Sequence, residues 1–173
     1  MKSIKNYIVR TDINKKETST ALPTLPCNKC KICKIINTDQ HIKNEYNGTS
    51  FKITSGGNCR TKNIIYVARC KIHKLLYVGH TGEELREPFN KHRYDAHKRP
   101  ENNKLATHIY DHKHEFEKDI NVMILKTDIF DKRERELLED FYICLLGTKS
   151  PTGLNKDLHQ YASEMYNPFN SLI

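Results

Sequence analysis

Two short apolar runs joined by a polar connection are the most constraining feature of this sequence. They are Ile64–Val67 and Leu75–Gly79, and both are rich in β-branched and aromatic residues, as strands are. The connection, Arg69–Lys74, has hairpin length. Thr81 follows, with Glu84 three residues later, a capping-box pattern that opens a helix. The sequence therefore predicts a β-hairpin, with a tyrosine in each strand, that leads into a helix.

The composition is that of a basic globular chain of 173 residues, with a net charge of +8 and a pI of about 9.1. This charge favours a polyanionic partner, either nucleic acid or an acidic membrane surface. Because no run of about 18 apolar residues occurs, we expect no membrane-spanning helix. We also expect no secretory signal, and hence a reducing compartment. The six cysteines are then metal ligands or free thiols rather than disulfides.

The densest cysteine cluster, Cys27-x-x-Cys30-x-x-Cys33, has the spacing of a zinc-binding turn. Thiolates at this spacing can reach one tetrahedral Zn²⁺ with bonds of about 2.3 Å. Three thiolates leave one position open, which Cys59 would fill, with His41 as the alternative. A hydrogen-bonded knuckle without metal would have the same spacing. We predict a structural zinc site here.

Downstream of the hairpin, the sequence predicts two helices and one more strand. Residues 103–112 form a short helix, and Ile120–Leu125 is expected to be the third, central strand of the sheet. Residues 131–146 are strongly periodic, and Gly147 ends this second helix. Its buried face is expected to consist of Leu138, Phe141, Tyr142 and Leu145.

The hairpin also carries a family resemblance. Ile64-Ile65-Tyr66 and Tyr77-Val78-Gly79 are similar to the paired signature of GIY-YIG endonucleases, with Ile64 in place of the first glycine. Together with further motifs in the same order, they resemble the endonuclease domain of Penelope-like retroelements over residues 26–157. These motifs are Cys27-x-x-Cys30-x-x-Cys33, Cys59, Leu85-Arg86, His92-Arg93, Glu139 before Phe141-Tyr142-Ile143, and Pro151-Thr152-Gly153-Leu154-Asn155.

The resemblance implies a second zinc site. Penelope-like domains have two cysteines between the tyrosine motifs and two later histidines, and here Cys70-x-x-His73 lies between the motifs. His73 would replace the second cysteine, because zinc accepts imidazole nitrogen and thiolate sulfur alike. His108 and His114 would supply the other ligands. His112, one helical turn after His108, is the alternative to His114.

The resemblance further implies a metal-dependent DNA endonuclease that nicks its target, with one Mg²⁺ or Mn²⁺ held by Glu139. By position, Tyr66 would activate the attacking water, Tyr77 would be a second active-site hydroxyl, and Asn155 would lie at the active site. A metal and fixed cations suit this reaction because negative charge concentrates on phosphate oxygens. The residues expected to bind DNA are Arg86, Lys91, His92, Arg93 and Lys98.

Pro88 departs from the family pattern. Family members resemble Leu-Arg-x-Arg here, with the second arginine stabilising charge at the scissile phosphate, and Pro88 stands in its place. Proline inside a helix removes a hydrogen bond, so we expect a kink or a new helix start at Pro88. Arg93 is expected to serve as the catalytic cation if the backbone shifts. The alternative is a zinc-stabilised DNA-binding domain with weakened or lost catalysis.

We therefore expect an α+β fold with a small, three-stranded, mainly antiparallel sheet flanked by helices and preceded by a cysteine-rich zinc module. The expected segments are a linker at 1–22 with a short strand at 7–9, the zinc module at 23–62, the nuclease domain at 63–157 and a tail at 158–173. The resemblance also implies a DNA partner, a nuclear location, and a reverse transcriptase region in the same polyprotein, and the lack of a long apolar run predicts no membrane partner.

Overall fold

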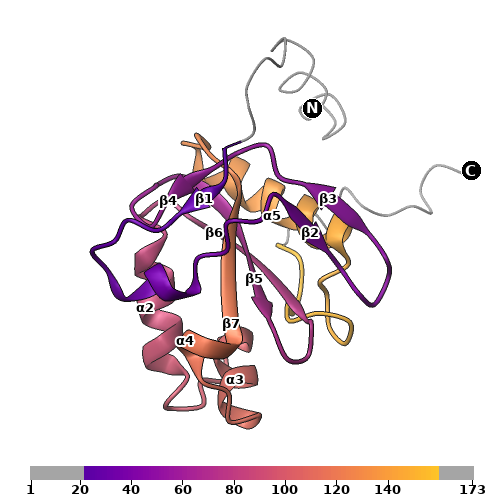
Figure 1. Cartoon of the computed structure of the whole chain (residues 1–173). Helices are drawn as coiled ribbons and strands as arrows, with labels where there is room; N and C mark the ends of the chain where they lie inside the picture. Colours follow the sequence, from indigo (N-terminus) through magenta and orange to yellow (C-terminus); the bar gives the residue numbers. More distant parts are fainter. Residues whose placement is uncertain (1–21, 160–173) are drawn as a thin grey trace, which may run out of the picture.

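A three-stranded antiparallel sheet forms the centre of the computed structural model, which describes residues 22–159 (Figure 1). The strands are β5 (Ile64–Cys70), β6 (Leu76–Thr81) and β7 (Ile120–Lys126). β5 pairs with both neighbours, so the order is β6-β5-β7. The predicted hairpin and the α+β class, with a small antiparallel sheet flanked by helices, are confirmed.

β7 lies at an edge of this sheet, so its predicted central position is wrong. Its side chains are largely buried, as in a central strand, because other segments cover its outer edge. The N–H of Asn37 donates to the carbonyl of Val122 (2.9 Å), and the N–H of Ile124 donates to the hydroxyl of Thr24 (2.9 Å). These contacts satisfy backbone groups that another strand would otherwise pair.

The face of the sheet that carries Tyr66 is covered by helical segments. They are η1 (Lys31–Ile35), α2 (Arg86–Asp95), α3 (Lys104–Asp111) and α4 (Phe116–Asp119). The cysteine-rich segment therefore shares one hydrophobic core with the later helices. That core includes Ile32, Ile35, Tyr66, Ala68, Phe89, Leu105, Ile109 and Phe116.

The opposite face is covered by α5 (Lys132–Leu146) and by a small antiparallel pair, β2 (His41–Lys43) and β3 (Ser50–Lys52) (Figure 1). A parallel pair, β1 (Thr24–Leu25) and β4 (Gly57–Asn58), completes the described strands. The second core lies between α5, these elements and the sheet. It includes Ile42, Ile53, Ile65, Val67, Val78, Met123, Tyr142, Ile143 and Leu146.

α5 ends as predicted, at Gly147 in the left-handed conformation (φ +62°), and Asp131 caps its start. Its predicted buried face is only partly right, because Leu145 is exposed while Leu138 and Phe141 are half-buried. The buried face of α5 also contains polar residues, and buried Arg135 donates to the carbonyl of Ile129 (2.7 Å). The buried residues are Arg135, Glu139, Asp140, Tyr142, Ile143 and Leu146.

α2 begins later than the capping-box pattern predicted. Its first residue is Arg86, and the Thr81 hydroxyl instead accepts from the N–H of Glu83 (3.0 Å) within a turn. Pro88 is thus the third residue of α2, where a backbone N–H would have no partner inside the helix. The expected new helix start at Pro88 is therefore wrong, and at this position in the first turn the proline requires no kink. The short helix predicted at 103–112 is confirmed as α3.

Some predictions fall outside the described residues. These are the linker at 1–22, apart from Leu22, with its strand at 7–9, and the tail at 158–173 beyond His159. Between residues 22 and 159, no helix has the length and apolar character needed to cross a membrane.

Candidate active site and metal centres

Four cysteine thiols from two segments of the chain converge beside η1. Cys27 precedes η1, Cys30 is its N-cap, Cys33 lies inside it, and Cys59 follows β4. The sulfur–sulfur distances are 3.4 Å for Cys27–Cys30, 3.6 Å for Cys30–Cys33 and 3.7 Å for Cys33–Cys59. A tetrahedron with metal–sulfur bonds of about 2.3 Å has edges of about 3.8 Å, so the cluster fits one metal ion. The alternative ligand His41 is exposed on β2, outside this cluster.

A second cluster of metal-ligand side chains lies at the turn of the central hairpin. Cys70 ends β5, His73 lies in the turn, and α3 and the residues after it supply His108 and His114. Nε2 of His114 lies 3.6 Å from the sulfur of Cys70 and 3.1 Å from Nδ1 of His73, which is 3.3 Å from Nε2 of His108. Burial, then the neighbouring histidines, lowers the pKa of His108 to about 4, which keeps a metal-binding nitrogen unprotonated. The alternative ligand His112 is exposed.

The two predicted catalytic tyrosines lie side by side on the sheet. Tyr66 of β5 is paired with Gly79 of β6, and the ring centroids of Tyr66 and Tyr77 are 6.5 Å apart. A Cβ at position 79 would come within 2.5 Å of the Tyr66 phenol, so glycine is required for the ring to lie across β6. Both tyrosines line a cavity of about 280 Å³, the tyrosine cavity. Its other lining residues are Pro88, Lys91, His92, Asp95, Pro100, Asn102 and Asn103.

His92 connects the tyrosine cavity to a chain of hydrogen bonds. Its Nε2 lies 3.5 Å from the Tyr66 hydroxyl, and its Nδ1 lies 2.8 Å from Oδ1 of Asn103. Asn103 also donates to Asp95 (3.0 Å) and accepts from the N–H of Ala106 (3.2 Å), which fixes the orientation of its amide. Because Oδ1 of Asn103 only accepts, Nδ1 of His92 carries the proton and Nε2 presents its lone pair to Tyr66.

Burial controls the ionisation of these groups. It raises the pKa of Tyr66 well above the ordinary value and raises that of Tyr77 too, and the charge of Glu139 adds to both shifts. Burial also lowers the pKa of His92, against the smaller opposing effect of its bond to Asn103. At neutral pH a neutral imidazole therefore faces a neutral phenol. The sequence placed His92 among DNA-facing or active-site-rim residues but not beside the Tyr66 hydroxyl, because no motif encodes how α2 packs on β5.

Glu139 lies buried on α5, on the side of β6. Its Oε2 contacts Nδ1 of His80 on β6 and lies 3.8 Å from Nε2 of His159. The ligand atoms of Glu139, His80 and His159 all lie within 4.8 Å of one another, which forms a third cluster able to hold a metal ion. The sequence did not indicate either histidine, since His159 follows the last recognisable motif.

The predicted arginines are held outside the tyrosine cavity. A guanidinium nitrogen of Arg93 lies 4.0 Å from a carboxylate oxygen of Glu117 on α4, and Nε of Arg86 lies 2.6 Å from Glu84. Neither arginine lines the cavity. Lys91 lines the tyrosine cavity. Among the described residues that line this cavity, Lys91 is the one lysine or arginine.

Asn155 contacts the backbone of β6 rather than the tyrosine cavity. Its Oδ1 accepts from the N–H of Val78 (2.9 Å) and from the hydroxyl of Thr148 (2.8 Å). Its Nδ2 donates to the carbonyl of Val78 (2.8 Å). The buried amide thus fixes the strand that carries Tyr77, which gives Asn155 a positioning role in this geometry.

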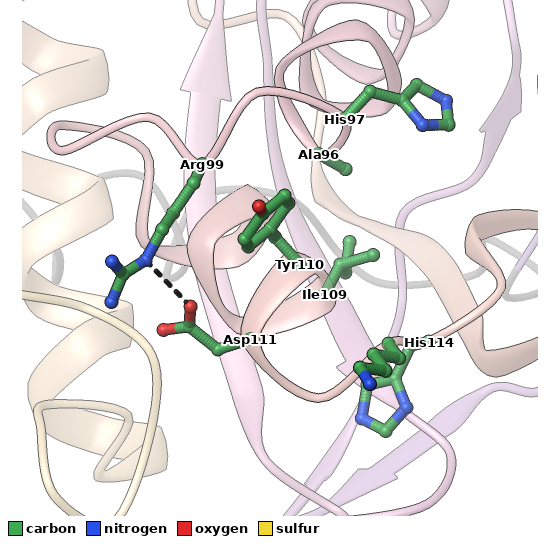
Figure 2. Close-up of a pocket in the computed structure, with 8 residues that line it drawn as sticks. Ala96, His97, Arg99, Ile109, Tyr110, Asp111 and His114 are labelled. Atoms are coloured by element: carbon green, nitrogen blue, oxygen red, sulfur yellow. Dashed lines mark hydrogen bonds and ion pairs between the residues drawn. The ribbon is translucent and has the colours of Figure 1, made fainter.

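A larger cavity of about 560 Å³ lies between the end of α2 and α3 (Figure 2). Figure 2 shows Arg99 pointing to Asp111, an ion pair of 2.9 Å, with the ring of Tyr110 close to it. Nearby, the ammonium of Lys98 lies 4.1 Å above the centre of the Tyr94 ring. Cationic groups beside exposed aromatic rings are typical of surfaces that bind nucleic acid.

Comparison with known proteins gives one distant likeness. The chain is similar to the catalytic domain of the homing endonuclease I-TevI, with a TM-score of 0.47 and 23% sequence identity. The match covers 56% of this chain and 99% of that domain. A likeness this distant assigns neither an activity nor site residues to this chain. No protein-family model and no curated protein matches the sequence.

Proposed function

We propose that this chain is a metal-dependent DNA endonuclease of GIY-YIG type that nicks one strand, as the resemblance to Penelope-like domains implies. The observation that carries the proposal is the tyrosine cavity itself. Tyr66 and Tyr77 come from paired strands, and His92 faces the Tyr66 hydroxyl. Glu139 lies on α5, outside the lining of this cavity, but its charge acts on both phenols. The basic net charge supports a DNA partner.

The proposed reaction uses Tyr66 and His92 as a proton relay. Tyr66 takes a proton from the attacking water while it passes its own proton to Nε2 of His92. The contact of 3.5 Å is long, but catalytic hydrogen bonds often tighten when substrate binds. A divalent ion bound by Glu139 would offset the negative charge that grows on the phosphate oxygens. Tyr77 would orient the phosphate from the neighbouring strand.

Lys91 is our candidate for the cation that Pro88 fails to supply. Both residues line the tyrosine cavity, whereas Arg93 is directed to Glu117. A lysine one helical turn along can approach the same phosphate because its side chain is long and exposed. The predicted catalytic role of Arg93 is therefore less well supported than a role for Lys91.

A second candidate function follows from Pro88, because proline stands where the resemblance places an arginine. In this alternative, the chain is a zinc-stabilised DNA-binding domain with weakened catalysis. A pocket that lacks one preorganised cation loses about 10²–10³ in rate, but DNA binding would persist. Binding dominated by phosphate contacts should then weaken steeply with salt, by about one log-slope unit per phosphate neutralised.

We also propose structural zinc at the two cysteine-containing clusters, at Cys27, Cys30, Cys33 and Cys59 and at Cys70, His73, His108 and His114. The division into a zinc module at 23–62 and a nuclease domain at 63–157 remains our proposal. So do the nuclear location and a reverse transcriptase region in the same polyprotein. All three rest on the resemblance.

A plasmid-nicking assay tests the nuclease proposal. Supercoiled DNA is incubated with the full chain and Mg²⁺ or Mn²⁺, and the appearance of nicked circles is measured. Glu139→Ala and Tyr66→Phe should abolish nicking and leave DNA affinity unchanged. Glu136→Ala is the matched control on the same helix, because Glu136 pairs with exposed Lys132. Binding without nicking in the unchanged chain, with either metal, would favour the DNA-binding alternative.

A further inference from the structure

We propose that His80 and His159 join Glu139 in one metal site. This site prefers a divalent transition metal that binds imidazole nitrogen, such as Mn²⁺, to Mg²⁺. The inference rests on the proposed nuclease function only for what the metal does. The binding itself follows from the three side chains. The resemblance implied a single carboxylate ligand, whereas the described structure brings two imidazoles to that carboxylate.

The three ligands come from separate parts of the fold. His80 lies on β6, Glu139 lies on α5, and His159 lies in the segment after α5, at the end of the described residues. Nε2 of His159 is 3.8 Å from Oε2 of Glu139, and Nδ1 of His80 contacts the same oxygen. Ligands of one ion with bonds of about 2.1 Å lie about 3–4 Å apart. Nε2 of His159 is already at this distance from Glu139, and the contacting atoms of His80 and Glu139 would move slightly apart to admit an ion between them.

The ring of His159 is already oriented for metal binding. Its Nδ1 lies 3.0 Å from Oδ1 of Asp140, and its backbone N–H also donates to that carboxylate (3.0 Å). Asp140 is 2% exposed, so it is a fixed acceptor that holds the proton on Nδ1. Nε2 is then the free nitrogen, and it faces Glu139. A ligating histidine held by a carboxylate in this way is the usual outer support of a metal site.

The donor set decides the class of metal. Mg²⁺ takes oxygen ligands in near-octahedral geometry and keeps several waters, so two imidazoles suit it poorly. Imidazole nitrogen raises affinity for transition metals, in the order Mn²⁺ below Co²⁺ below Cu²⁺, and two histidines with one carboxylate leave positions open for other ligands. A scissile phosphate oxygen and a water could take these open positions.

Electron paramagnetic resonance of bound Mn²⁺ tests the site directly. The full chain is loaded with two equivalents of zinc, so that the cysteine-containing clusters are filled, and Mn²⁺ is added. We expect nitrogen hyperfine coupling from imidazole, and competition only by at least tenfold more Mg²⁺. His80→Gln and His159→Gln should each weaken Mn²⁺ binding about 10- to 100-fold, and Mg²⁺ binding far less. His41→Gln, an exposed histidine on β2, should change neither.

Two outcomes separate this inference from the proposed function. Absence of nitrogen coupling, or unchanged Mn²⁺ affinity in both histidine variants, would show that the three side chains form only a hydrogen-bonded cluster, even if Mg²⁺ supports nicking. Nitrogen coupling without nicking would contradict the nuclease and leave the metal site standing. Circular dichroism of each variant checks folding, and Asp140→Asn, which keeps His159 in place, should weaken Mn²⁺ less than His159→Gln.

Discussion

The Tyr66 hydroxyl lies 3.5 Å from Nε2 of His92, between β5 and α2, and both side chains are buried. Asn103 holds the proton on the opposite ring nitrogen, so the free lone pair of His92 is directed at the phenol. This contact links the first tyrosine of the hairpin signature to a helix that also carries Pro88 and Lys91. Because of this contact, we assign His92 to the proposed proton relay with Tyr66 rather than to DNA binding.

Replacing His92 by glutamine should lower the nicking rate about 10²- to 10⁴-fold, the range lost when a general base is removed. DNA affinity should stay within about twofold, because the imidazole faces Tyr66 rather than the exposed surface. Rates and affinities are measured on the same plasmid. His97→Gln is the control, since His97 is exposed five residues further along. If affinity falls in parallel with the rate, His92 contacts DNA and the relay is wrong.

The pH dependence of nicking should follow the ionisation of His92. Burial, and to a smaller extent the charge of Lys91, lower the pKa of His92, whereas Asn103 and Asp95 raise it. His92 faces Tyr66, which stays neutral because burial raises the pKa of the phenol. The relay needs neutral His92, so activity is full above the ordinary histidine pKa of about 6.5 and is lost only below it. The same shift stabilises the fold above that pH relative to acid, because the unfolded chain binds the proton first. If the nicking rate instead falls to half its maximum at a pH above about 6.5, the group that limits activity in acid is not His92.

Much of the fold follows from local signals in the sequence. β-Branched and aromatic residues placed the hairpin, and Gly147 placed the end of α5, because a left-handed residue there is favourable only for glycine or asparagine. The cysteine spacing brought Cys27, Cys30 and Cys33 together, since a short turn suffices. In each of these cases, neighbours in sequence determine the geometry.

The failures have one physical cause, which is tertiary contact. The Thr81–Glu84 pattern has the residues of a capping box, but it does not cap a helix here. Leu85 is buried and the N–H of Arg86 donates to the carbonyl of Cys59, and α2 begins only at Arg86. The edge of β7 is hidden by a segment some 85 residues earlier, as the isolated bridge between Ile36 and Val122 shows. Neither contact leaves a periodic signal. The direction of Arg93 toward Glu117, and the approach of His159 to Glu139, could not be foreseen for the same reason.

Zinc removal should unfold the cysteine-rich segment and lower the melting temperature. A structural site contributes folding free energy directly, because it does not exist in the unfolded chain. Elemental analysis should give about two zinc ions per chain when no zinc is added in excess. Cys33→Ser should lose one of them, whereas Cys144→Ser should lose none, because Cys144 is exposed on α5 and outside both clusters. Unchanged melting in a strong chelator would contradict both sites.

Lys91 should matter more than Arg93 for cleavage. Lys91 lines the tyrosine cavity, whereas Arg93 points to Glu117, so Lys91→Ala should lower the nicking rate about 10²- to 10³-fold, as expected for one preorganised cation. Arg93→Ala should affect mainly DNA affinity. Both variants remove one positive charge from the same turn of α2, so each is the control for the other. The readout is nicking at saturating DNA, together with affinity at two salt concentrations.

Pro88→Arg completes this comparison. Pro88 lines the tyrosine cavity and its missing N–H costs α2 no hydrogen bond, so the arginine should raise nicking at least tenfold and leave the melting temperature nearly unchanged. In the Lys91→Ala background it should restore activity, because an arginine at position 88 would supply the missing cation. If Arg93→Ala abolishes nicking while Lys91→Ala and Pro88→Arg change nothing, Arg93 swings into the cavity when DNA binds and the assignment of Lys91 is wrong.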